Sequence, residues 1–192
     1  DINNGKSCQT YSPDKPFVVV LQHAVTTEAE HSQWQIGNTL EAIKTLGIPA
    51  IWFCPNADQG TFGIGEGIRE FRRQNPQIPV RFSGHVDSAR FIQLLRDCVC
   101  LIGNSSAGIR ECGVLGTPVV NIGNRQYGRE RGPNVIDSIP ESGAIVSAVR
   151  YQLARGPYEP VYIYGDGKAG QRIARLLAAT PIILEKHILP VL

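Results

Sequence analysis

The sequence predicts an α/β domain: a three-layer, Rossmann-like arrangement of a parallel sheet with helices on both faces. Short β-branched runs alternate with amphipathic segments along most of the chain. The first of these runs is apolar over several consecutive residues, as a strand buried on both faces is. With 42% hydrophobic and 19% charged residues, the chain also has the composition of an ordered globular protein.

Residues 16–180 are expected to form one domain, because 192 residues suffice for a single substantial core. Residues 1–15 are polar and are interpreted as a linker, and residues 181–192 as a C-terminal tail. The sequence contains no Met, so the chain is expected to begin inside a longer polypeptide or to have been trimmed.

The first predicted strand begins at Pro16 and ends at His23. A helix is expected from Thr26 to about Leu46, where Gly47 stops it. Further strands are predicted at 48–54, 80–82, 98–103 and 117–122, and further helices near 66–74, 88–97, 106–115, 142–155 and 169–179.

Polar residues that follow the predicted strands are candidates for a site, because parallel sheets bind ligands at the carboxyl ends of their strands. They are His23, Asn56 with Asp58, His85, residues 103–108 and residues 121–125. All would lie at the same edge of the sheet.

Residues 103–108, Gly-Asn-Ser-Ser-Ala-Gly, join a predicted strand to a predicted helix. Glycines and small side chains let a ligand approach the backbone, and the N–H groups of a helix N-terminus attract an anion. Ser105 and Ser106 add two hydroxyls. An ordinary serine N-cap accounts for the same residues equally well.

Charged residues near this turn favour an anionic ligand. Glu111 lies little more than one helical turn beyond Ser106, and its carboxylate can accept hydrogen bonds from two ribose hydroxyls. Arg110 and Arg125 can neutralise phosphate charge, or they are solvated surface arginines. His23 can orient or protonate a leaving phosphate, or it is a histidine hydrogen-bonded at the sheet edge.

Several classes of ligand are disfavoured. The formal net charge of +2 argues against nucleic acid, and the apolar run at residues 17–21 is too short to span a membrane. Cys98 and Cys100 have no second Cys/His pair at ligand spacing, so no metal is expected, nor any other cofactor. Four of the five cysteines sit in apolar runs and are interpreted as reduced core thiols of a cytoplasmic protein.

Residues 165–170, Gly-Asp-Gly-Lys-Ala-Gly, match the letters of the dinucleotide-binding fingerprint. No strand–helix–strand unit and no acidic ribose ligand follow them. A turn that leads into a helix is the better interpretation.

Several segments together resemble the UDP-N-acetylglucosamine 2-epimerases, especially the hydrolysing branch that serves sialic acid synthesis. The resemblance extends from about Pro16 to about Leu177 and keeps the order and spacing of the motifs. The matching segments are residues 21–27 (LQHAVTT), 55–60 (PNADQG), 91–94 (FIQL), 102–111 (IGNSSAGIRE), 116–121 (GTPVVN), 125–130 (RQYGRE) and 164–167 (YGDG).

The resemblance implies that this chain is the C-terminal, UDP-binding half of a two-domain GT-B fold. His23 would then lie near the diphosphate and the reaction centre, and Asn56 in the nucleotide site. Val86 would contact uracil through its backbone, and Glu111 the ribose. Ser105 and Ser106 would bind the diphosphate, and Arg125 the phosphates.

The family reaction eliminates UDP through a 2-acetamidoglucal intermediate and then adds water, which yields N-acetylmannosamine and UDP. By resemblance, the acid and base carboxylates belong to an N-terminal half that this sequence lacks. The chain is therefore expected to bind UDP or UDP-N-acetylglucosamine without turning it over, and the full-length enzyme to form a homo-oligomer. Two alternatives stay open: half of a UDP-sugar-dependent GT-B glycosyltransferase, and a stand-alone UDP-sugar-binding module.

Overall fold

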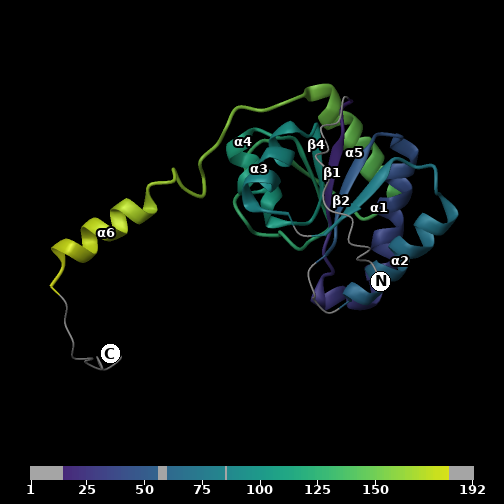
Figure 1. The fold of residues 1–192 in the computed structure, drawn as a ribbon, viewed down its shortest axis with the longest axis horizontal. Coiled ribbons are helices and arrows are strands. Elements are labelled where there is room, and N and C mark those ends of the chain that lie inside the picture. Colours follow the sequence, from purple (N-terminus) through teal and green to yellow (C-terminus); the bar gives the residue numbers. More distant parts are fainter. Residues whose placement is uncertain (1–14, 56–59, 85, 182–192) are drawn as a thin grey trace.

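The computed structural model describes residues 15–55, 60–84 and 86–181, and its centre is a six-stranded parallel sheet (Figure 1). The strands are β1 (Val18–Leu21), β2 (Ala50–Phe53), β3 (Val80–Ser83), β4 (Cys100–Gly103), β5 (Val119–Ile122) and β6 (Val135–Ser138). Their order in the sheet is β3-β2-β1-β4-β5-β6. The order reverses between β1 and β4, which is where open parallel sheets of this kind bind ligands.

Helices cover both faces of the sheet. They are α1 (Ser32–Leu46), α2 (Thr61–Gln74) and α5 (Ser142–Arg155) on one face, and α3 (Ser88–Asp97) and α4 (Glu111–Leu115) on the other. Successive side chains of a strand point to opposite faces, so Val18 and Val20 pack in the first core cluster, and Val19 and Leu21 in the second. The predicted three-layer α/β fold class is confirmed.

The helix predicted over 106–115 is wrong as a continuous element. A 3₁₀ turn, η2 (Ser106–Gly108), comes first and α4 begins only at Glu111. The backbone at Gly108 lies so close to β5 that a Cβ there would come within 2.8 Å of Val119 Cγ1. Glycine at this position therefore lets the turn pack directly against β5.

Two other helices differ from their predicted bounds. The segment predicted as one helix from Thr26 begins with a 3₁₀ helix, η1 (Thr26–His31), which precedes α1. α2 begins at Thr61, before the predicted start near Glu66. α5 and α6 (Ala169–Ala179) have the predicted bounds.

The sequence does not predict β6. This strand is only four residues long, and Asp137 and Ser138 are polar, so its pattern is weak. It pairs in parallel with β5 at the edge of the sheet, with Asn121 opposite Asp137. β6 therefore extends the carboxyl edge beyond β5.

The segment after α5 runs along α4 and then leaves the domain. Tyr158 N–H donates to the Gly116 carbonyl at 2.8 Å, and Val161 N–H to the Gly113 carbonyl at 2.9 Å. α6 then extends away from the sheet and has no buried residue (Figure 1). The Asp166 carboxylate accepts the Lys168 N–H and pairs with Arg172, as a turn leading into a helix does.

Candidate functional site

Asn104, the first residue after β4, joins the ends of β1 and β4. Its Oδ1 accepts a hydrogen bond from the His23 N–H, and its Nδ2 donates to the His23 carbonyl, both at 2.8 Å. Its own N–H donates to the Leu21 carbonyl at 3.0 Å. The side-chain amide thus continues the β1–β4 pairing, whose last backbone pair is Leu21 with Gly103. Asn104 is 2% exposed, so water does not compete for these bonds.

Only glycine fits at the residue before Asn104. Gly103 has a φ of +138°, which side chains rarely allow, and a Cβ there would lie 2.0 Å from the Leu21 carbonyl oxygen. Gly103 therefore lets the two strand ends come close enough for Asn104 to reach His23.

The loop after β5 is attached to the same residue. The Asn104 carbonyl accepts hydrogen bonds from Arg125 Nη1 at 3.2 Å and from Gln126 Nε2 at 2.7 Å. We call His23, Asn104, Arg125 and Gln126 the Asn104 cluster. It holds three strand ends, those of β1, β4 and β5, in a fixed relation at the carboxyl edge of the sheet.

Ser105 and Ser106 follow directly and are half-buried, so a ligand can reach them. The Ser105 hydroxyl accepts the Ala107 N–H at 3.3 Å, which is an N-cap of η2. The capping role considered for the sequence is therefore present, although a hydroxyl that accepts one bond can still donate another. Arg125, which donates to the Asn104 carbonyl, places a cationic group beside this turn.

Arg125 lines a polar cavity of about 540 Å³, which we call the inner cavity. Its other walls include Thr26 and Thr27, at the start of η1, and Asn124 and Tyr127. His23 precedes these residues in the chain and is 6% exposed. The structure thus brings His23, Ser105, Ser106 and Arg125 together around Asn104, as the strand-end argument predicts.

Glu111 and Val86 lie toward α3 and α4. Glu111 is the first residue of α4 and lines a separate hollow of about 290 Å³ with Arg110 and Tyr164. The Arg110 guanidinium lies 5.8 Å from the centre of the Tyr164 ring. Val86 precedes α3 and packs against the second core cluster. Asn56, Asp58 and His85 lie outside the described residues.

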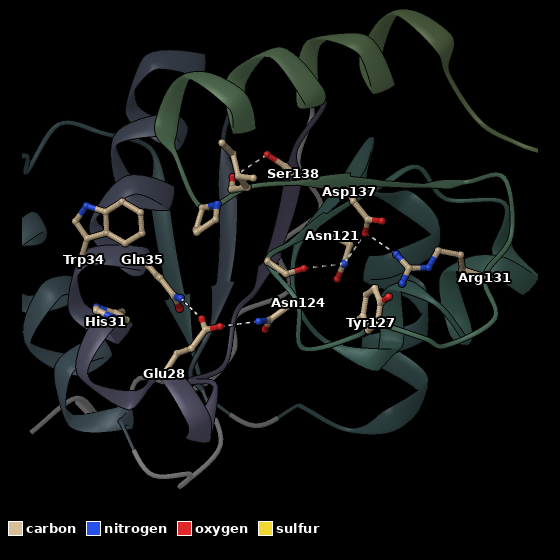
Figure 2. Close-up of a pocket in the computed structure, with 13 residues that line it drawn as sticks. Glu28, His31, Trp34, Gln35, Asn121, Asn124, Tyr127, Arg131, Asp137 and Ser138 are labelled. Atoms are coloured by element: carbon tan, nitrogen blue, oxygen red, sulfur yellow. Dashed lines mark hydrogen bonds and ion pairs between the residues drawn. The ribbon is translucent and has the colours of Figure 1, made fainter.

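A larger cavity, the outer cavity of about 880 Å³, lies over the ends of β5 and β6. Figure 2 shows Glu28 between Gln35 and Asn124: its carboxylate accepts from Gln35 Nε2 at 2.7 Å and from Asn124 Nδ2 at 2.6 Å. Sequence reasoning missed Glu28 as a site residue because an acid in a first helical turn is ordinary. Asn124, the partner of Glu28, belongs to the polar cluster at residues 121–125, and that cluster was the sequence signal for this region.

Cys98 and Cys112 are buried in the second core cluster. Burial raises the pKa of the Cys98 thiol to about 12, and raises the pKa of the Cys112 thiol well above its ordinary value. Both thiols are therefore protonated at neutral pH. Within the described part of the chain, no three His, Cys, Asp or Glu residues gather as a metal site, and no helix has the length and apolarity to cross a membrane.

Comparison with known proteins points to one family. The family model described as UDP-N-acetylglucosamine 2-epimerase matches residues 2–178. A Legionella pneumophila protein named UDP-N,N'-diacetylbacillosamine 2-epimerase (hydrolyzing) is 33% identical over 172 residues, which are 90% of this chain and 45% of that protein. A Neisseria meningitidis protein named UDP-N-acetylglucosamine 2-epimerase is 28% identical over 159 residues, 81% of this chain and 40% of that protein. The chain spans less than half the length of these relatives.

Solved structures share the fold. UDP-GlcNAc 2-epimerase from Neisseria meningitidis, bound to UDP-GlcNAc, gives a TM-score of 0.64 at 15% identity over 86% of this chain and 45% of that one. E. coli ADP-heptose heptosyltransferase II gives 0.57 at 14% identity over 76% of this chain and 49% of that one. These likenesses agree with the prediction of one half of a GT-B fold. Because the family model covers nearly the whole sequence and the fold agrees with it, the chain belongs to the UDP-N-acetylglucosamine 2-epimerase family.

Proposed function

We propose that this chain is the UDP-binding half of a hydrolysing UDP-N-acetylglucosamine 2-epimerase. The whole enzyme would convert UDP-N-acetylglucosamine and water to N-acetylmannosamine and UDP, in the cytoplasm, for sialic acid or amino-sugar biosynthesis. The observation that carries the proposal is the Asn104 cluster, which holds His23 and Arg125 next to the serine turn, at the point where the strand order reverses.

The diphosphate binds between the serine turn and Arg125. Ser105 and Ser106 donate from their hydroxyls, and the Arg125 guanidinium, held by the Asn104 carbonyl, neutralises charge. The nucleoside extends toward α3 and α4, where Glu111 accepts from the ribose hydroxyls and the Val86 backbone meets uracil. Asn56 belongs to the same nucleotide site in this proposal.

The chemistry begins when the bond between the sugar C1 and the diphosphate oxygen breaks. Negative charge then grows on the leaving phosphate, and the fixed Arg125 guanidinium stabilises it without reorganising. The imidazole of His23 orients that phosphate or supplies a proton to it. The acid and base carboxylates come from the N-terminal half, so the chain alone binds UDP and does not epimerise.

Calorimetric titration of the purified chain with UDP tests the site. Arg125→Ala and Glu111→Ala should each weaken UDP binding by roughly 1–3 kcal/mol, the usual loss for a charge-assisted hydrogen bond. Arg129→Ala is the matched control, because Arg129 is an exposed arginine of the same loop. Equal affinities for the wild type, Arg125→Ala and Arg129→Ala would contradict the assignment.

The activity of the chain is a separate test. Incubation with UDP-N-acetylglucosamine should release neither N-acetylmannosamine nor UDP, whereas the full-length parent should release both. Measurable epimerisation by the chain alone would show that the catalytic carboxylates lie within it.

A glycosyltransferase half is the second candidate, favoured by the likeness to heptosyltransferase II. Such an enzyme would use the same nucleotide site but transfer the sugar to an acceptor. Product analysis separates the two, because only the epimerase yields free N-acetylmannosamine. A stand-alone binding module would yield neither free N-acetylmannosamine nor a glycosylated acceptor, whether the chain or its full-length parent is assayed.

A further inference from the structure

The inner and outer cavities are neighbours. Asn124 and Tyr127, both in the loop after β5, line the inner cavity with Arg125 and also line the outer one. A ligand whose phosphates contact Arg125 can therefore continue past Asn124 without leaving the protein surface. In a nucleotide sugar, the group beyond the second phosphate is the sugar.

The lining of the outer cavity combines aromatic and hydrogen-bonding groups. Trp34, which is 54% exposed, and Tyr127 flank the Glu28–Asn124 pair (Figure 2). A hexose ring has faces made of C–H groups, which pack on aromatic rings, and a rim of hydroxyl or acylamino groups, which need hydrogen-bonding partners. A volume of about 880 Å³ falls within the range of small-molecule pockets.

The polar side chains are held in place by one another. Glu28 comes from η1, Gln35 from α1 and Asn124 from the β5 loop, and their hydrogen bonds join these three segments. On the far side, Asn121 Nδ2 donates to Asp137 at 2.7 Å. Groups oriented before the ligand arrives bind it without the entropic cost of ordering them.

We propose that the outer cavity binds the sugar of the nucleotide sugar and selects for acylamino groups, with Glu28 and Asn124 as the specificity residues. An acylamino group donates from its N–H and accepts at its carbonyl. The Glu28 carboxylate provides the acceptor, and the Asn124 amide provides the donor. This inference rests on the proposed UDP site. The same selection concerns the sugars for which the relatives are named. One relative is named for a sugar with one acetylamino group, and another for a sugar with two.

Two ligands that differ only in the acetylamino group test the proposal: UDP-N-acetylglucosamine and UDP-glucose. The wild-type chain should bind the former at least fivefold more tightly. In Glu28→Gln this ratio should fall to twofold or less, while affinity for UDP itself stays unchanged. Glu30→Gln, a change in the same short helix at an exposed acid, is the matched control and should keep the wild-type ratio.

The two tryptophans supply an independent readout. Trp34 lines the outer cavity, whereas Trp52 is 0% exposed in the core. In NMR spectra of the ¹⁵N-labelled chain, UDP-N-acetylglucosamine should shift the Trp34 indole N–H signal and leave that of Trp52 in place. UDP should shift the backbone signals of Ser105 and Ser106 but not the Trp34 indole.

The outcomes separate the two proposals. If UDP fails to bind the wild-type chain, the proposed function fails, and the sugar inference with it. If UDP binds and shifts the Ser105 and Ser106 signals, but the Trp34 indole does not respond to UDP-N-acetylglucosamine and Glu28→Gln keeps the wild-type ratio, only the sugar inference is overturned.

Discussion

The Asn104 cluster and the outer cavity lie at the same edge of the sheet but are built in opposite ways. In the cluster, the Asn104 side chain bonds to backbone groups of His23 and is buried. In the outer cavity, side chains bond to side chains at a partly exposed surface, as Glu28 does with Asn124. The cluster therefore fixes the path of the backbone, whereas the shape of the cavity depends on side chains that can be substituted.

Under the two proposals above, this difference matches the two parts of a UDP-sugar. The diphosphate is common to all UDP-sugars, and a rigid backbone site suits it. The sugar varies, and side chains that carry little of the folding free energy can change with it at low cost. If this is correct, substitutions in the cluster should destabilise the fold strongly, and substitutions in the cavity should not.

The largest effect is expected from Gly103→Ala. The new Cβ would overlap the Leu21 carbonyl oxygen, and alanine rarely adopts the backbone conformation found there, so stability should fall by about 3 kcal/mol or more. Gly37→Ala in α1 is the control: open space surrounds that position, and alanine should gain roughly 0.5–1 kcal/mol in a helix. Urea denaturation measures the stability of both variants. If Gly103→Ala is well tolerated, the Asn104 cluster is not the rigid region of the two.

Asn104→Ala tests the cluster without altering the backbone. It removes the two hydrogen bonds that the His23 N–H and carbonyl make with the Asn104 side chain in a buried site, which should cost at least about 2 kcal/mol, because each lost bond costs about 1–3 kcal/mol. Asn124→Ala, in the exposed loop of the outer cavity, should cost less than about 1 kcal/mol. Similar losses in the two variants, measured by the same denaturation experiment, would show that the two regions do not differ.

Asp137→Asn tests the far side of the outer cavity. It weakens the ion pair with Arg131, but that pair is exposed on the aspartate side, and such pairs contribute about 0–1 kcal/mol. The expected loss is therefore below about 1 kcal/mol and should shrink further in 1 M salt. A loss above 2 kcal/mol would mean that this cavity also supports the fold.

The smallest effect is expected in α6, outside both regions. Leu177 is 69% exposed, so Leu177→Ala should change the stability of the chain by no more than about 0.5 kcal/mol. Leu95→Ala in α3, where the side chain is fully buried, should cost about 2–5 kcal/mol by comparison. A clear loss in Leu177→Ala would indicate contacts of α6 beyond those of the described residues.

Much of the fold could be predicted from local pattern. Apolar runs such as residues 18–21 mark strands buried on both faces, and α5 and α6 have the predicted bounds. β6 was missed because an edge strand buries little and carries little pattern. The helix over 106–115 was wrong as one element, and the close approach of Gly108 to Val119 in that segment is a tertiary contact that local pattern does not report.

The candidate site was predictable in part. The strand-end rule located His23, the serine turn and Arg125, because the carboxyl ends of parallel strands share one edge of a sheet. It did not predict that Asn104 would bond both backbone groups of His23, since these residues are 81 positions apart. It also missed the Glu28–Asn124 pair, which spans 96 positions.

The sequence by itself determined the order of the first five strands and of the helices, and which residues follow each of those strands, because periodicity, glycines and β-branched runs act over a few neighbouring residues. Only the tertiary structure decided that Asn104 joins three loops, that α4 begins at Glu111, and that Trp34 and Tyr127 line one cavity. Those outcomes depend on hydrogen bonds and close packing between segments far apart in the chain, which short-range patterns do not encode.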